Sequence, residues 1–149
     1  MSPTIKENDS MDASPFQIRI IDRVNPIEII ALYREAGWWK EEYDSNTDFL
    51  EKIVENSACF AGAFHGEKMV GMGRAISDKV SDAYIQDVAV LKKFQRMGIG
   101  KSIVQLLISH LKQTGVDWIG LIGTPGTEAF YENIGFKPME NHIPFVYLG

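Results

Sequence analysis

Hydrophobic residues along the chain follow two periods, which together predict a series of strands and helices. Alternation or short apolar runs predict strands at residues 16–21, 59–65, 69–76, 84–90, 118–122, 136–139 and 145–148. Spacing of three and four residues predicts helices that begin at Pro26, near Asn46 or Thr47, and after Gly100, and a short helix that ends at Gly135. The turn at Gly66–Glu67 joins two of the strands as a hairpin. This pattern predicts an α+β fold.

The stretch from residue 82 to residue 122 is the most informative, because it predicts a strand, a loop, a helix and a second strand in succession. Gly98 and Gly100 lie where the loop enters the helix, so free backbone N–H groups and the positive end of the helix dipole can receive a phosphate there. Four basic residues cluster at the same place: Lys92, Lys93, Arg96 and Lys101.

Three phosphate-loop patterns compete for this loop. A Walker A loop would need a glycine where the chain has Gln95, and a dinucleotide-binding fingerprint would need its third glycine at Ile103. The pattern that fits is Q-x-x-G-x-G, from Gln95 to Gly100.

This pattern resembles the pyrophosphate loop of the GNAT superfamily of acetyl-CoA-dependent N-acetyltransferases. The segment AFYENIGF at residues 129–136 resembles a second GNAT segment that follows the next strand, and the likeness extends from Phe16 to the C-terminus. The resemblance implies a mixed, mostly antiparallel twisted sheet with helices on both faces. It also implies that the parallel strands at 82–90 and 118–122 splay apart to admit acetyl-CoA.

The resemblance further implies which residues hold the co-substrate. Backbone groups of the strand contact the pantetheine arm, and loop amides contact the pyrophosphate. The candidate acetyl-CoA-binding residues are Val88, Val90, Gln95, Arg96, Met97, Gly98, Ile99, Gly100, Lys101, Phe130 and Asn133.

Two residues are candidates for proton transfer. Tyr131 aligns with the tyrosine that many GNAT enzymes use as general acid to the departing sulfur; its alternative role is packing beside Phe130. Asp87 is the only carboxylate within the strand proper, where it either assists proton removal through water or serves as a structural hydrogen-bond acceptor. Tyr84, Gln86 and Val88 share one face of this strand unless a bulge changes the alternation.

The acceptor site is expected to include the connector after the first helix. Trp38 and Trp39, with Glu41, Glu42 and Asp44, suit a cationic amine through cation–π contact and charge pairing, while core packing explains the tryptophans equally well. Tyr84 and Gln86 are further candidate substrate residues. The chain also looks like bacterial GNAT proteins allied to arylalkylamine N-acetyltransferases.

Composition and net charge argue against several classes of partner and location. The 149 residues are expected to form one domain at 16–149 after a flexible tail at 1–15. A formal net charge of −5 argues against nucleic acid, and no apolar run predicts a membrane span or a secretory signal. The lone Cys59 is expected to be a buried packing residue, and a cytoplasmic location is the default. No metal is expected, because His65, His110 and His142 lack ligand spacing.

The predicted activity is transfer of an acetyl group from acetyl-CoA to a primary amine, with a small cationic acceptor favoured, by direct attack in a ternary complex. The alternatives are acetylation of a protein lysine or N-terminal amine, and a non-catalytic acyl-CoA-binding module. The expected partners are acetyl-CoA and the amine, with a homodimer left open.

Overall fold

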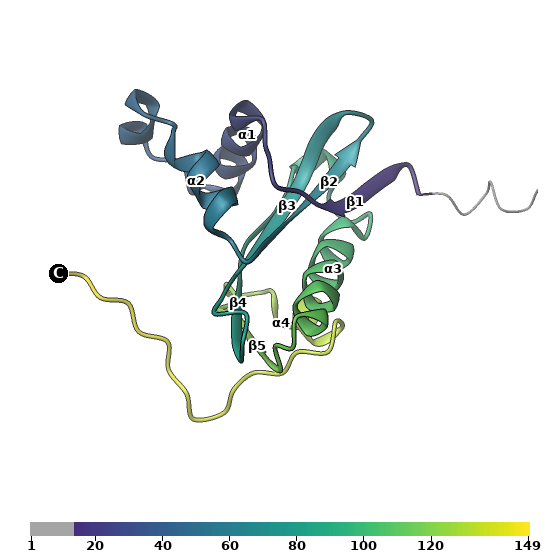
Figure 1. Ribbon diagram of the computed structural model, residues 1–149, viewed down its shortest axis with the longest axis vertical. Coiled ribbons are helices and arrows are strands. Elements are labelled where there is room, and N and C mark those ends of the chain that lie inside the picture. Colours follow the sequence, from purple (N-terminus) through teal and green to yellow (C-terminus); the bar gives the residue numbers. More distant parts are fainter. Residues whose placement is uncertain (1–13) are drawn as a thin grey trace, which may run out of the picture.

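Figure 1 shows the computed structural model, which describes residues 14–149 and contains a five-stranded sheet with helices packed on it. The strands lie in the sheet in chain order: β1 (Phe16–Ile20), β2 (Cys59–His65), β3 (Lys68–Ser77), β4 (Asp82–Val90) and β5 (Trp118–Gly120). The first four are antiparallel to their neighbours, whereas β4 and β5 are parallel. The predicted α+β fold with a mixed sheet is confirmed. All but the last two residues of the predicted tail lie outside the described residues.

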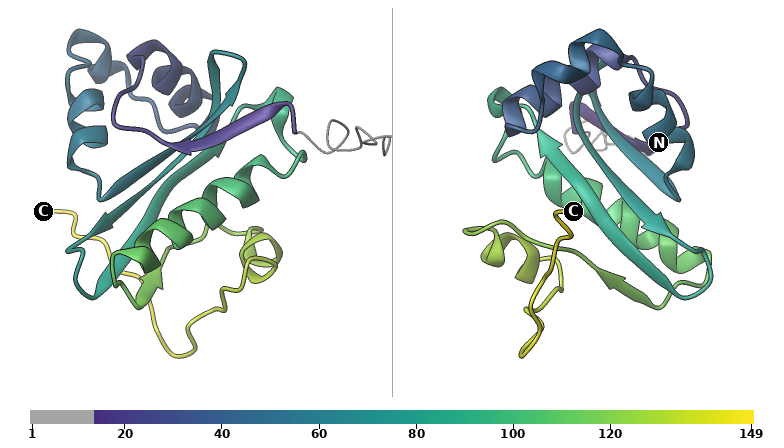
Figure 2. Two further views of the ribbon diagram at one scale, coloured as in Figure 1. Left: turned by 45° about the vertical axis from the view of Figure 1, so that its right-hand side comes forward. Right: turned by 90° about the vertical axis from the view of Figure 1, so that its left-hand side faces the viewer.

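Helices cover both faces of this sheet (Figure 2). On one face lie α1 (Pro26–Ala36) and α2 (Phe49–Asn56), and on the other lies α3 (Ile99–Gln113); the short α4 (Glu128–Glu132) follows β5. Two short 3-10 helices, η1 (Glu41–Ser45) and η2 (Lys92–Phe94), complete the elements.

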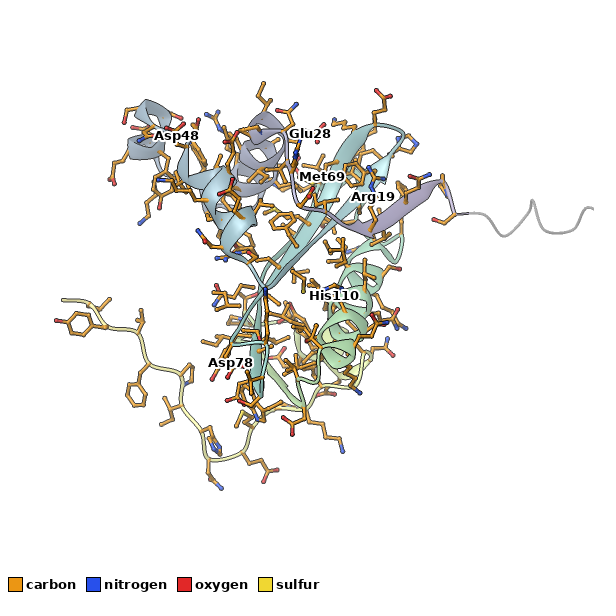
Figure 3. All side chains as sticks on the ribbon, in the orientation of Figure 1. Arg19, Glu28, Asp48, Met69, Asp78 and His110 are labelled. Carbon is orange, nitrogen blue, oxygen red and sulfur yellow. The ribbon has the colours of Figure 1, made fainter. Side chains whose placement is uncertain are left out.

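Local signals set the ends of α1 as predicted. The Asn25 side chain accepts a hydrogen bond from the Ile27 N–H at 3.1 Å, and Gly37 ends the helix in the left-handed conformation with φ of 80°. Glu28 then ties α1 to the sheet, because its carboxylate accepts the Met69 N–H at 3.2 Å (Figure 3). Both caps and this contact fix the helix over the start of β3.

The core lies on both sides of β2 and β3, and on the α3 side it depends on glycine. A Cβ at Gly73 would stand 2.7 Å from Cγ2 of Ile103, so only glycine lets α3 pack this closely on the strand. The most deeply buried large side chains are Phe60, Ile29, Leu32, Leu50, Met69, Met72, Ile103, Leu107, Leu111, Val70 and Val104. This packing fixes the start of α3 relative to the end of β4.

The parallel strand pair is short, and β4 extends beyond the end of β5. Only Asp82, Ala83 and Tyr84 pair with β5, and residues 85–90 of β4 continue without that neighbour. A β-bulge also interrupts the β3–β4 ladder, where Asp87 and Val88 together stand opposite Gly73, and Asp87 adopts φ of 55°. The predicted splayed pair is therefore present.

Several predicted boundaries are wrong. The strands expected at 136–139 and 145–148 do not form; the chain after Phe136 has only a turn at 140–141 and is otherwise extended, and a strand needs a neighbour to pair with. Strand β5 ends at Gly120, before the predicted Ile122, and α3 already begins at Ile99. The second helix begins later than expected, at Phe49, and the fourth ends at Glu132, before the expected Gly135.

Candidate active site

The start of α3 offers free backbone amides. Gly98 precedes the helix with φ of 81° and makes no side-chain capping bond, so the N–H groups of the first turn have no helical acceptor. Arg96 also has a positive φ, 64°, and such turns bring successive N–H groups onto one concave surface. Amides arranged in this way can bind an anionic group, and the contact with pyrophosphate stays a prediction.

Gln95 holds the loop against the strand that precedes it. Its Nε2 donates to the Val90 carbonyl at 3.0 Å, while the Lys92 N–H donates to the Glu35 carboxylate of α1 at 2.9 Å. These two bonds tie both ends of the turn to fixed elements. Gln95 is thus placed to position the loop, a role that its prediction as a binding residue did not specify.

The backbone of β4 beyond the bulge faces the gap beside β5. The Leu91 N–H donates to Val70 O of the β3 side at 2.9 Å, and successive residues of a strand direct their backbone groups to opposite sides. The backbone groups of Val90, and of Val88 two residues earlier, therefore point away from β3 and toward the gap. This is the orientation that contact with a pantetheine arm requires.

The bulge carries a polar cluster on the α1 side of the sheet. Oδ2 of Asp87 accepts hydrogen bonds from Nε of Arg74 at 2.7 Å and from the Tyr33 hydroxyl at 2.9 Å. Desolvation by burial, followed by the neighbouring Asp87 charge, raises the pKa of Tyr33 well above its ordinary value. The bulge also separates Val88 from Gln86, because the side chain of Val88 lies on the α3 side, near Gly73. The bulge is the exception that the expectation named, so Tyr84, Gln86 and Val88 do not all share a face.

Sequence reasoning missed Arg74 and Tyr33. Arg74 had a visible signal, because it is a charged residue in the middle of the otherwise apolar run 69–76. Tyr33 had none, since its spacing in α1 is that of an ordinary core residue and its side chain is buried.

Tyr131 lies at a cavity beside the parallel strands. The cavity has a volume of about 670 Å³, and its lining includes Tyr84 of β4, Trp118 of β5, Tyr131 of α4 and residues of the 136–144 segment. The Tyr131 ring packs edge-on against Phe130 and Phe136, and burial raises the pKa of its hydroxyl. Within residues 14–149 that hydroxyl makes no hydrogen bond, so its proton is not committed to a structural contact.

Phe130 connects this helix to the phosphate loop. A Cβ at Gly100 would lie 3.3 Å from Cζ of Phe130 and 3.8 Å from Cγ2 of Val90. Three predicted co-substrate residues are thus brought together at one point. Met97 and Asn133 are exposed; Met97 lies in the loop and Asn133 follows the end of α4.

The two connector tryptophans have different surroundings. Trp38 is 41% exposed and contacts Tyr33 edge-on at 5.8 Å, beside the Asp87 cluster. Trp39 packs with Tyr43 and Phe49 and donates from Nε1 to Asp44 at 2.9 Å. The carboxylate of Asp44 also pairs with Arg34 at 3.4 Å, so it already has two internal partners. Glu41 and Glu42 remain exposed on η1.

Cys59 is buried as predicted, and burial raises the pKa of its thiol to about 11. The thiol therefore stays protonated near neutrality, which fits packing and disfavours a nucleophilic role. Among the described residues, none of the helices is long and apolar enough to pass through a bilayer.

Comparison with known proteins identifies the family. The model of the Acetyltransferase (GNAT) family matches residues 25–136. The uncharacterized N-acetyltransferase ycf52 of Porphyra purpurea is 38% identical over 131 residues, which cover 88% of this chain and 75% of that protein. Histone acetyltransferase TAP1 of Glycine max is 37% identical over 125 residues, or 76% of this chain and 52% of that protein.

A solved structure agrees with these sequence matches. A GNAT family acetyltransferase from Streptococcus pneumoniae has 25% sequence identity and a TM-score of 0.76, with 90% of this chain and 98% of that chain covered. The chain therefore belongs to the GNAT family of acetyltransferases, which are acyltransferases that use acetyl-CoA as co-substrate.

Proposed function

We propose that the protein transfers the acetyl group of acetyl-CoA to the primary amine of a small cationic molecule, in a ternary complex. The observation that carries this proposal is the junction of β4, the loop and α4. Free amides at the start of α3, gap-facing backbone at Val88 and Val90, and the side chain of Phe130 meet there.

In this proposal the loop and strand hold acetyl-CoA. Amides of Arg96 and residues 98–101 receive the pyrophosphate, and Lys101 adds charge at its rim. The backbone of Val88 and Val90 bonds to the pantetheine arm, while Gln95 maintains the loop. Phe130, Met97 and Asn133 border the remainder of the co-substrate.

The chemistry follows from the thioester. The neutral amine nitrogen attacks the carbonyl carbon, forming the C–N bond, and the carbonyl oxygen becomes an oxyanion that a backbone N–H of β4 stabilises. The C–S bond then breaks, and the departing thiolate takes the proton of the Tyr131 hydroxyl. A phenol is protonated at neutral pH, and burial raises the pKa of Tyr131 further, so this proton is available. The new amide nitrogen loses its surplus proton, which returns Tyr131 to the phenol form.

An amine that binds as the ammonium cation must first lose a proton, because only the neutral nitrogen can attack the carbonyl carbon. Oδ2 of Asp87 is held by Arg74 and Tyr33, so a proton passed to this carboxylate would reach it at Oδ1 or through a water. The same contacts suit Asp87 to a positioning role, in which it maintains the bulge that orients Val88. Removal of the amine proton directly to water fits the site equally well.

The acceptor is proposed to enter beside Trp38, Tyr84 and Gln86. Trp38 presents an exposed indole next to the Asp87 cluster, and Tyr84 is 47% exposed. The carboxylates of Glu41 and Glu42 add negative charge on η1. Trp39 contributes to this wall indirectly, since it packs the connector against α2.

A second acceptor class has one observation in its favour. The soybean relative is a histone acetyltransferase, and the exposed acidic 3-10 helix η1 also suits a basic peptide. In this alternative a lysine side chain takes the place of the small amine, and the roles of the loop and Tyr131 are unchanged.

The test is acetyl-CoA turnover with a panel of acceptors, followed by release of free CoA thiol. The panel contains arylalkylamines, polyamines, anilines and lysine peptides, each matched with its N-acetylated form as a control. We expect release with cationic small amines and none with the acetylated controls. Tight acetyl-CoA binding without release for any acceptor would support the acyl-CoA-binding module instead.

A further inference from the structure

The bulge in β4 holds one residue in a conformation that strands do not normally contain. Asp87 has φ of 55°, in the left-handed region, and within the strands of residues 14–149 it is the only residue with a positive φ. A residue with a Cβ keeps this conformation only where its surroundings hold it there. The contacts of Asp87 therefore indicate what maintains the bulge.

Two side chains from different elements hold the Asp87 carboxylate. Nε of Arg74, in β3, donates to Oδ2 at 2.7 Å, and the Tyr33 hydroxyl, in α1, donates to the same oxygen at 2.9 Å. Only 16% of the Arg74 side chain and 25% of the Asp87 side chain are exposed, whereas the ion pair of Arg34 and Asp44 is exposed by 60% and 57%. Solvent and salt screen the sheltered pair less, so it can hold a strained backbone.

Arg74 also lies where the register of the β3–β4 ladder changes. It stands opposite Gln86 in the last regular pair before the bulge, and its Nη2 lies 3.5 Å from Oε1 of Gln86. One planar guanidinium thus contacts both Gln86 and Asp87. A lysine carries its charge at a single nitrogen, so it cannot reproduce both contacts in the same plane.

The bulge determines where the next backbone groups point. Met72 pairs with Ala89, so Asp87 and Val88 together occupy the place of one residue. Without the extra residue, Val88 would stand where Ala89 stands, and its N–H would face β3 instead of the gap beside β5. The conformation of Asp87 therefore sets the direction of the Val88 N–H.

We propose that Arg74 is a positioning residue for acetyl transfer, which holds Asp87 in its left-handed conformation and so keeps the Val88 N–H directed into the gap, available to the thioester carbonyl. This inference rests on the proposed function, because that N–H matters to the reaction only if acetyl-CoA binds in the gap. Arg74 touches neither the co-substrate nor the reacting atoms, and it acts through Asp87. An ion pair with a purely structural role would instead affect stability alone.

The first experiment separates kcat from binding. Arg74→Met keeps the length of the side chain and removes its donors, and it should lower kcat by about tenfold to a hundredfold, because a displaced N–H stabilises the oxyanion less. The Kd of CoA, which has no acetyl group, should change much less in calorimetry. Arg74→Lys should recover only part of the lost kcat.

Arg19→Met is the matched control for this experiment. The Arg19 guanidinium lies over the Phe64 ring at 3.9 Å, on β1 at the far edge of the same sheet (Figure 3). Its loss should lower Tm and leave both kcat and the Kd of CoA unchanged. If Arg74→Met likewise lowered Tm and kept the wild-type kcat, the proposal would be overturned.

The second experiment tests whether Arg74 acts through the backbone of Asp87. Glycine adopts a positive φ without a side chain to hold it, so Asp87→Gly removes the need for Arg74. Arg74→Met should therefore lower kcat less in the Asp87→Gly background than in the wild-type background, which makes the two substitutions non-additive. An equal loss in both backgrounds would show that Arg74 does not act through Asp87.

The third experiment needs no turnover. In protein with isotope-labelled valine, the Val88 amide signal is assigned with Val88→Ala, and its shift on adding acetyl-CoA is compared with its shift on adding CoA. The two shifts should differ in the wild-type chain and in Arg19→Met, and the difference should disappear in Arg74→Met. No CoA release by a wild-type chain that shows this difference would reject the proposed function and leave the positioning role intact. No difference in the wild-type chain, or the same difference in Arg74→Met, would overturn the positioning role itself.

Discussion

Two tyrosines with raised pKa values differ in what their protons can do. The Tyr33 hydroxyl donates to Asp87 at 2.9 Å, so its proton takes part in a structural hydrogen bond. Tyr131 lines a cavity, and its hydroxyl makes no hydrogen bond within residues 14–149. Both phenols are protonated at neutral pH, but only Tyr131 can give its proton to a ligand without breaking a contact.

Removal of the Tyr131 hydroxyl is therefore predicted to affect the chemical step. Tyr131→Phe keeps the ring that packs between Phe130 and Phe136, and should lower kcat by roughly tenfold to a thousandfold with little change in the acetyl-CoA KM. Steady-state kinetics with two acyl thioesters that differ in the acidity of their leaving thiols checks this. The loss of kcat in Tyr131→Phe should be smaller for the more acidic thiol, because its thiolate depends less on a proton from Tyr131. If the variant kept the wild-type kcat in an assay in which the chemical step limits turnover, Tyr131 would have only its packing role.

Tyr33 is predicted to make stability depend on alkaline pH. Its folded pKa is raised above 10.0, so the stabilising contribution is present below pH 10 and is lost as pH rises toward the folded value. Tyr33→Phe removes the ionisable group and should flatten this decline. Urea unfolding at several pH values measures it, in a Cys59→Ala background because Cys59 also has a raised pKa, about 11. Parallel declines in both proteins would contradict the assignment.

At the scale of elements, the loop and the connector place the site between rigid parts. The loop between β4 and α3 is held at Val90 and at Glu35, while the connector between α1 and α2 is held by the Trp39–Tyr43–Phe49 cluster. Each segment leaves one feature free of these contacts: the amides of the first turn of α3, and the exposed indole of Trp38. Each feature allows a matched pair of substitutions.

Gly98 and Gly37 form the first pair. Both have φ near 80°, and no atom lies within 4 Å of a Cβ built on either, so alanine would cost about 1–2 kcal/mol in backbone strain at each. Gly98→Ala should weaken CoA binding in calorimetry by roughly five- to thirtyfold, because the strain would turn the loop amides away. Gly37→Ala should lower Tm about as much as Gly98→Ala does, because the backbone strain is the same, but it should leave CoA affinity unchanged. Equal CoA affinity in both variants would refute the phosphate-loop assignment.

Trp38 and Trp39 form the second pair. Trp38→Leu should reduce acceptor kcat/KM by a few-fold to about thirtyfold with acetyl-CoA affinity unchanged, because it removes an exposed π face worth about 0.5–2 kcal/mol to a cation. Trp39→Leu should instead lower Tm, since it loses the Asp44 hydrogen bond and the contact with Phe49. The reverse assignment of effects would show that Trp39 faces the acceptor.

At the scale of the whole molecule, the sequence predicted the structural features that depend on residues close to one another in the chain. Asn25 and Gly37 set the ends of α1, and Gly66 with Glu67 set the hairpin, because each acts within a few residues. The bulge at Asp87 was not predicted, since Tyr33 and Arg74, which bind it, come from distant parts of the chain. Apolar patterning at 145–148 predicted a strand that does not form, because pattern alone does not show whether a neighbouring strand is present to pair with it. The roles assigned to the site residues remain predictions.

The distribution of charge over the whole chain leads to a final prediction. The chain carries a formal net charge of −5, whereas Lys92, Lys93, Arg96 and Lys101 are exposed together around the loop. None of the four forms an ion pair with a described carboxylate. This local positive charge attracts the phosphates of CoA, whereas the remaining, negatively charged surface repels them. Salt weakens both interactions, because the Debye length is about 10 Å at 0.1 M ionic strength.

CoA affinity should therefore fall several-fold between about 0.05 M and about 0.5 M salt. Lys101→Ala should reduce the slope of log Kd against log salt, because it removes one of the charges beside the amides at the start of α3. Lys112→Ala, an exposed lysine in the last turn of the same helix, is the matched control and should leave the slope unchanged. Calorimetry at four salt concentrations measures all three slopes. If the two lysine variants changed the slope equally, the overall charge would govern CoA binding, and the basic cluster would have no special role.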